Sequence, residues 1–161
     1  MANIMAKKLV SRSEIREFVQ RFSEMDHYEA IGEFIYKFSQ LEFLIKYRLF
    51  KSLELRQELF DIITGPYDFA MLCTVSAETL KSTPGISDDK KKVIEKYFNA
   101  CKAFNQENRV VVAHASWSLS GARHVKRNSL KADMHFPDAK DVKAKSQEIT
   151  KLMLRISETN I

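Results

Sequence analysis

Arg109 and His114 are the two side chains whose types and spacing best suit chemistry in this sequence. An imidazole titrates near neutral pH, so His114 can take or give a proton during a reaction. A guanidinium stays charged and binds two phosphate oxygens at once, so Arg109 can hold a phosphate. Together they suit cleavage of a phosphodiester, in which a hydroxyl loses a proton and the phosphorane needs positive charge nearby. The ordinary structural interpretation is that Arg109 pairs with a carboxylate and that His114 ends a helix.

The composition restricts the class of protein. The chain has 161 residues, of which 45% are apolar, only 4 are glycine and 3 are proline, and it has no apolar run that could span a membrane. We therefore expect one domain, residues 1–161, around a single core. The segment 1–10 lacks the apolar stretch of a signal peptide, which predicts a cytoplasmic protein with no membrane partner. Cys73 and Cys101 have apolar neighbours and are expected as free core residues.

Apolar residues recur at helical spacing along most of the chain, which predicts an all-α fold, an up-and-down helical bundle. A helix start such as Ser87, and breaks such as Gly65-Pro66, set the predicted helix ends. After His114 the spacing changes to alternation, which predicts a short β-hairpin or an irregular insert before the last helix. The predicted helices cover residues 13 to about 25, about 27 to 53, about 55 to 64, 67 to 80, 87 to 114 and about 138 to 157.

Two of these helices carry polar side chains in a stripe that is otherwise apolar. A buried unpaired carboxylate is costly, so Glu42 must pair with a cation, reach water or be protonated, and the candidate cations are Lys46 and Arg109. Asn105 and Asn108 occupy the corresponding stripe of the fourth helix, so packing the two helices together would enclose one polar site. The alternative is that the asparagines lie on a solvated edge or fix the helix register. The expected stripe of the second helix is Ile31, Ile35, Phe38, Glu42, Ile45 and Leu49.

The order of these features resembles the HEPN superfamily of helical ribonucleases and toxin-type domains. The resemblance rests on the long helix with Glu42, the turn after the third helix, the Arg-x4-His motif that ends the fourth, and Trp117 soon afterwards. It covers about residues 27–157. The resemblance implies a HEPN-like fold and a metal-independent endoribonuclease without a cofactor. It also implies a homodimer with a shared cleft, in which the 2′-hydroxyl of the RNA attacks phosphorus and leaves a cyclic phosphate.

By position, the resemblance makes His114 the general acid or base and Arg109 the group that holds the phosphate. Five residues apart on a helix corresponds to about 140°, so one helix does not direct both side chains at one phosphate. A cleft shared across a two-fold axis removes that difficulty. Basic side chains after the motif would bind the RNA backbone and add affinity that salt weakens. The expected supporting residues are Glu42, Asn105 and Asn108, and the expected RNA-binding residues are Arg123, Lys126 and Arg127.

Two other hypotheses come from the same residues. Val110 stands where many active family members have a polar residue, and Ser116 where one toxin–antitoxin branch has tyrosine. The first alternative is a non-catalytic HEPN-like dimeric interaction module with a structural Arg109 and His114. The second is a metal enzyme, although the histidines lack a tight ligand spacing. The biological setting stays open between antiviral defence, a toxin with its antitoxin, and RNA processing. An antitoxin or a defence protein would then be a further partner. The histidines of the metal hypothesis are His27, His114, His124 and His135.

Overall fold

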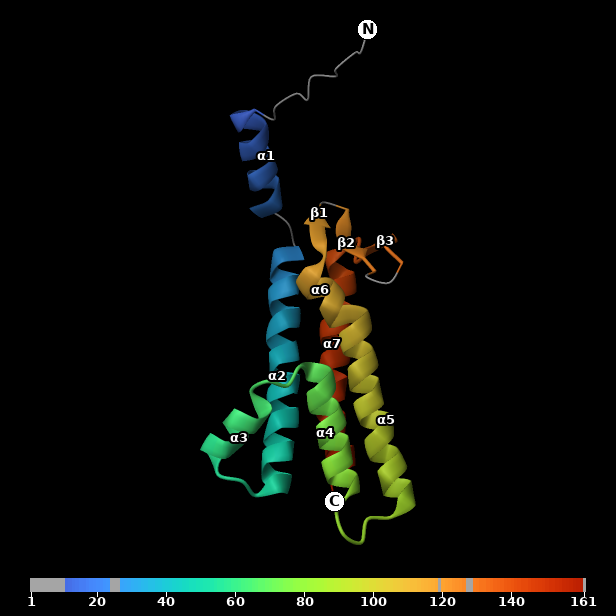
Figure 1. Ribbon diagram of the computed structural model, residues 1–161. Coiled ribbons are helices and arrows are strands. Elements are labelled where there is room, and N and C mark those ends of the chain that lie inside the picture. The colour runs from blue at the N-terminus through green and yellow to red at the C-terminus, as the bar shows by residue number, and fades with distance from the viewer. Residues whose placement is uncertain (1–10, 24–26, 119, 127–128, 161) are drawn as a thin grey trace.

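The computed structural model describes residues 11–23, 27–118, 120–126 and 129–160, and it is mostly helical with a small sheet near one end (Figure 1). The predicted end of the first helix, Met25, and the segment 1–10 lie outside these residues. No described helix combines the length and the apolar character needed to cross a membrane. The elements are α1 (Arg12–Ser23), α2 (His27–Leu53), α3 (Gln57–Thr64), α4 (Phe69–Lys81), α5 (Asp88–Phe104), the π-helical turn η1 (Asn105–Arg109), α6 (Val110–His114), β1 (Ser116–Ser118), β2 (Gly121–Val125), β3 (Ala132–His135), α7 (Ala139–Arg155) and the 3₁₀ turn η2 (Ile156–Thr159).

Capping side chains and breaks place the helix ends near the predicted positions. Helix α5 begins after Ser87, whose Oγ accepts the backbone N–H of Lys90 at 3.3 Å. Helix α7 begins after Asp138, which forms a capping box with Asp141. Gly65-Pro66 falls between α3 and α4, as predicted from the missing proline N–H. The predicted strand region before the last helix is also present, as a three-stranded antiparallel sheet.

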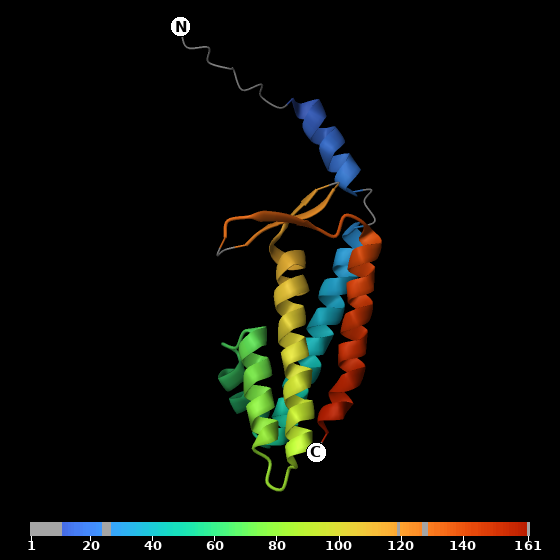
Figure 2. The ribbon, with the colours of Figure 1, turned by 90° about the vertical axis from the view of Figure 1, so that its right-hand side faces the viewer.

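Helices α2, α4 and α7 run in one direction and α5 runs in the other (Figures 1 and 2). Nε2 of His27, at the start of α2, lies 3.3 Å from the carbonyl oxygen of Phe136, just before α7. Nη2 of Arg48, near the end of α2, donates to the carbonyl of Thr159 at 3.2 Å, so α2 and α7 are parallel. Helix α3 returns the chain part-way along α2, and α4 then repeats the direction of α2. The chain therefore reverses direction at α3, α4, α5 and α7, although α3 covers only part of the length of α2.

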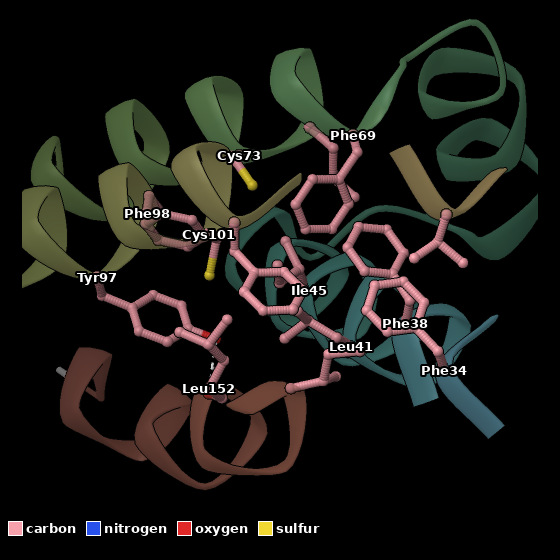
Figure 3. Packing of buried hydrophobic residues seen from close by; sticks show 14 of the residues in the cluster. Phe34, Phe38, Leu41, Ile45, Phe69, Cys73, Tyr97, Phe98, Cys101 and Leu152 are labelled. Atoms are coloured by element: carbon pink, nitrogen blue, oxygen red, sulfur yellow. Dashed lines mark hydrogen bonds between the residues drawn. The ribbon is translucent and has the colours of Figure 1, made fainter. Parts of the chain in front are cut away.

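The core lies between α2, α4, α5 and α7 (Figure 3). The predicted buried stripe of α2 is wrong at two positions, because Ile35 is 41% exposed and Glu42 is half-buried at the surface. Phe34 and Leu41 take their places, and both are 0% exposed. This rotation of α2 buries a ring and a branched aliphatic chain in place of a carboxylate. It thereby avoids the free-energy cost of desolvating a charge.

Two polar contacts join α5 to its neighbours inside this core. Cys73 of α4 and Cys101 of α5 are free and fully buried, as predicted. The contact with Cys101, together with burial, raises the pKa of the Cys73 thiol. The hydroxyl of Tyr97 donates to the backbone carbonyl of Leu152 at 3.1 Å, which ties α5 to α7. The thiols therefore serve as small packing groups between α4 and α5.

Candidate active site

His114 ends α6 with an exposed side chain and lines a pocket of about 870 Å³ between the helix and the sheet, called the His114 pocket below. The helical wall comes from η1 and α6, and the opposite wall comes from β2, β3 and the residues that follow β2. The pocket is thus assembled from segments that are distant in the sequence. Its polar side chains include Gln106, Glu107 and His114 on the helical side and His124, Lys126 and His135 on the sheet side.

The sheet is fixed against α6 by Trp117 and by a close backbone approach at Gly121. Nε1 of Trp117 donates to the backbone carbonyl of Val112 at 3.1 Å, and its ring stacks on Phe136 with centroids 6.2 Å apart. Trp117 therefore acts as a packing anchor between the sheet and α6. Gly121 has φ +107°, and a Cβ there would lie 2.6 Å from the carbonyl oxygen of His135. Only glycine allows β2 to start this close to β3.

The sheet wall of the His114 pocket carries two imidazoles and one amine. The rings of His124 and His135 meet edge to face, with centroids 6.3 Å apart. Nζ of Lys126 lies 2.8 Å from Oδ2 of Asp133 on the neighbouring strand. These contacts fix side chains in the sheet wall of the pocket. Sequence reasoning proposed Lys126 as an RNA-binding residue but placed His124 only in the metal hypothesis.

The ion pair with Lys126 lowers the pKa of Asp133 from its ordinary value, chiefly through their hydrogen bond. Because the folded-state pKa is lowered, the pair stabilises the folded sheet above the ordinary carboxylate pKa. That contribution is lost as the pH falls through the lowered value. Lys126→Ala is therefore expected to raise the pKa of Asp133 toward its ordinary value, as measured by NMR titration of the carboxylate carbon. Lys131→Ala is the control and should cause a smaller rise; an unchanged pKa in Lys126→Ala would contradict the ion pair.

Arg109 lines a second pocket, of about 420 Å³, together with Glu42 and Asn105, called the Arg109 pocket below. Cζ of Arg109 lies 5.9 Å from the ring centroid of Phe38, which is a cation–π contact. Glu42 pairs with Lys46 at 2.9 Å, so the local cation, of the two candidates, is its partner. Among the described residues, no carboxylate forms an ion pair with Arg109. The guanidinium is therefore left with hydrogen-bonding capacity for an anion.

Arg109 and His114 do not line the same pocket, but their pockets are neighbours. Gln106 and Val110 line both of them. The turn η1 lies at this point, with the backbone N–H of Val110 bonded to the carbonyl of Asn105, five residues back. Such a turn inserts one extra residue into a helix and is frequent at functional sites. Two pockets side by side on one helix can receive adjacent groups of one extended ligand.

Of three other predicted site residues, two lie away from both pockets and one lies outside the residues that the structure describes. Asn108 is 7% exposed, and its Nδ2 donates to the carbonyl of Phe104 at 3.3 Å. It lines a separate groove against α7, because neighbouring residues on a helix point about 100° apart. Arg123 is exposed on β2 and lines neither pocket. Arg127 lies outside the described residues.

The four histidines of the metal hypothesis do not form one cluster. His27 lies beside Trp117, with ring centroids 5.7 Å apart, and does not line the His114 pocket. In the described part of the chain, no group of three histidine, cysteine, aspartate or glutamate side chains is placed to hold a metal ion. Comparison with known protein families, curated proteins and solved structures finds no match to this chain. The residues and geometry of the two pockets therefore carry the functional proposal.

Proposed function

We propose that this chain is a HEPN-like, metal-independent endoribonuclease that cleaves RNA by attack of a 2′-hydroxyl on the neighbouring phosphorus. The observation that carries the proposal is the His114 pocket, in which the imidazoles of His114 and His124 share one cavity with the amine of Lys126. This set supplies an acid, a base and a cation, which are the three groups that the reaction needs.

The reaction balances with these groups alone. One imidazole takes the proton of the 2′-hydroxyl while the 2′-oxygen forms its bond to phosphorus. The bond from phosphorus to the 5′-oxygen then breaks, and the other imidazole, protonated, gives its proton to that leaving oxygen. The products are a 2′,3′-cyclic phosphate and a free 5′-hydroxyl. The ammonium group of Lys126 stabilises the negative charge of the phosphorane between the two steps.

Arg109 would hold a neighbouring phosphate of the same RNA. An RNA chain carries one phosphate per nucleotide, so adjacent phosphates can occupy the two neighbouring pockets. Contacts to the backbone fix the position of the nucleic acid without reading its sequence. Glu42 and Asn105 line the Arg109 pocket and would support this contact. The cleft shared by two copies, and an antitoxin or defence protein as partner, stay predictions from the family resemblance.

The test is incubation of a mixed single-stranded RNA with the protein in chelator, followed by determination of the product ends. We expect cyclic phosphate and 5′-hydroxyl ends. The same RNA with 2′-O-methyl groups is the matched control and should stay intact, because it lacks the attacking hydroxyl. Binding to that uncleavable RNA should weaken as salt is raised. No cleavage by folded protein, or products with 3′-hydroxyl ends, would contradict the proposal.

The separation of Arg109 from His114 favours a second candidate, the non-catalytic HEPN-like interaction module. In that case the two side chains serve binding or packing. An apolar residue at Val110, which lines both pockets, is then compatible with the function, because no catalysis takes place there. A folded protein that binds RNA or a partner protein but leaves all RNA intact would support this candidate. The RNA incubation above therefore decides between the two functions.

A further inference from the structure

Helix α2 carries a second apolar stripe on the side opposite the core. Tyr36, Phe43 and Tyr47 are 66%, 60% and 49% exposed, respectively. The rings of Phe43 and Tyr47 stack with centroids 6.3 Å apart, so they form a continuous surface. Tyr36 and the buried Ile45 are nine residues apart, which places them about 180° apart on a helix. Exposed aromatic side chains gathered on one helix face in this way are typical of a binding face.

This stripe continues toward both ends of α2 with the spacing of a coiled-coil seam. The steps between its members are three or four residues, as in a heptad repeat. Acidic residues occupy the amino-terminal end and a lysine occupies the carboxyl-terminal end. Gln40 lies at the centre, because Glu29 and Lys51 are each eleven residues away from it. The outer seam of α2, as it is called below, consists of Glu29, Glu33, Tyr36, Gln40, Phe43, Tyr47 and Lys51.

The order of charges along the outer seam favours one orientation of a partner, although Glu29 and Glu33 also pair with Lys143 and Lys37 of the same chain. In a parallel pair of identical seams, Glu29 would face the same glutamate and Lys51 the same lysine, which is unfavourable. In an antiparallel pair, a two-fold axis at Gln40 places Glu29 opposite Lys51 of the partner subunit, and the reverse contact follows by symmetry. We propose that α2 binds the α2 of a second copy of this chain in antiparallel orientation, with Gln40 on the axis.

This pairing goes beyond the proposed function and does not depend on it. From Glu29 to Lys51 the outer seam is about 33 Å long at 1.5 Å per residue. His27, at the start of α2, lies beside Trp117 of the sheet, so the sheet is at the amino-terminal end of α2. An antiparallel pair therefore places the two His114 pockets at opposite ends of the assembly. This dimer therefore excludes the shared cleft that the family resemblance predicts, and cleavage would take place within the His114 pocket of one copy.

A cysteine on the two-fold axis tests this geometry. Two copies of Gln40→Cys should meet across the axis and form a disulfide-linked dimer under mild oxidation. Asn99→Cys is the matched control, because Asn99 is an exposed amide on α5 and should give no such dimer. The native Cys73 and Cys101 are 0% exposed and do not interfere. A Gln40→Cys protein that cross-links no better than the control would overturn the proposed pairing.

Substitutions within the outer seam test its energetics through the oligomeric state, measured by light scattering at several concentrations. We expect a wild-type dimer and loss of the dimer in Phe43→Glu, with an unchanged circular dichroism spectrum. Glu29→Lys and Lys51→Glu should each weaken the dimer severalfold, and the double variant should restore it, because opposite charges face each other again. A monomeric wild type at every concentration would overturn the proposal. The outer seam would then not bind a second copy of this chain. A dimer that survives Phe43→Glu would overturn it as well.

Discussion

Replacing His114 by alanine is expected to lower the rate constant of RNA cleavage by about 10²- to 10⁴-fold, because a positioned acid or base contributes that much. The His114 side chain is exposed, so its loss removes no buried contact and should leave the fold intact. Single-turnover cleavage of a defined RNA in chelator measures the effect. His124→Ala is expected to lower the rate constant of RNA cleavage by a factor in the same range. The double variant should be little slower than either single one, since the two imidazoles act as a unit.

Lys131→Ala is the matched control for these active-site variants. Lys131 is exposed, precedes β3 and does not line the His114 pocket, so its replacement should leave the rate constant unchanged. Equal cleavage by wild type and by His114→Ala would remove this pocket from the reaction. Loss of cleavage in Lys131→Ala would also count against the pocket, because it would indicate a general charge effect.

Leu41→Ala is expected to reduce the free energy of unfolding by about 2–5 kcal/mol, through lost burial and the cavity that remains. Leu41 is 0% exposed at the centre of α2, among the aromatic rings of the core. Leu154→Ala is the same chemical change on α7 at a site that is 72% exposed, and it should stay within about 0.5 kcal/mol of wild type. Chemical denaturation followed by circular dichroism measures both variants. Similar values for the two would contradict the described orientation of α2 or α7.

Features set by neighbouring residues could be predicted from the sequence. The bounds of α2, His27–Leu53, agree with the prediction, as do the starts that Ser87 and Asp138 cap. The direction of α4 could not be predicted, because it depends on how α3 packs against α2. Phe60 of α3 meets Phe50 of α2 edge to face at 5.3 Å, a contact between separate helices that holds α3 against α2.

The sequence identified several residues of the candidate site, but not which of them line the same pocket. Arg109 and His114 were singled out by type, and they line two separate pockets, in agreement with their separation of about 140° around a helix. Sequence alternation predicted strands after His114, but it could not give the register that brings His124 to the pocket. That register depends on pairing between β2 and β3, with His124 opposite Asp133. Glu42 falls in the expected stripe but is half-buried and paired with Lys46, because the cost of burying an unpaired charge favours a small rotation of the whole helix.

The wall that β2 and β3 form is a separable part of the molecule. The chain leaves the helices after α6 and rejoins them at α7, at the same end of the core (Figure 2). Connections of this kind tolerate changes of length far better than the elements that they join. A longer or shorter connection between β2 and β3 would reshape the His114 pocket while the helices keep their packing. Ligand preference and thermodynamic stability can therefore diverge independently as such chains evolve.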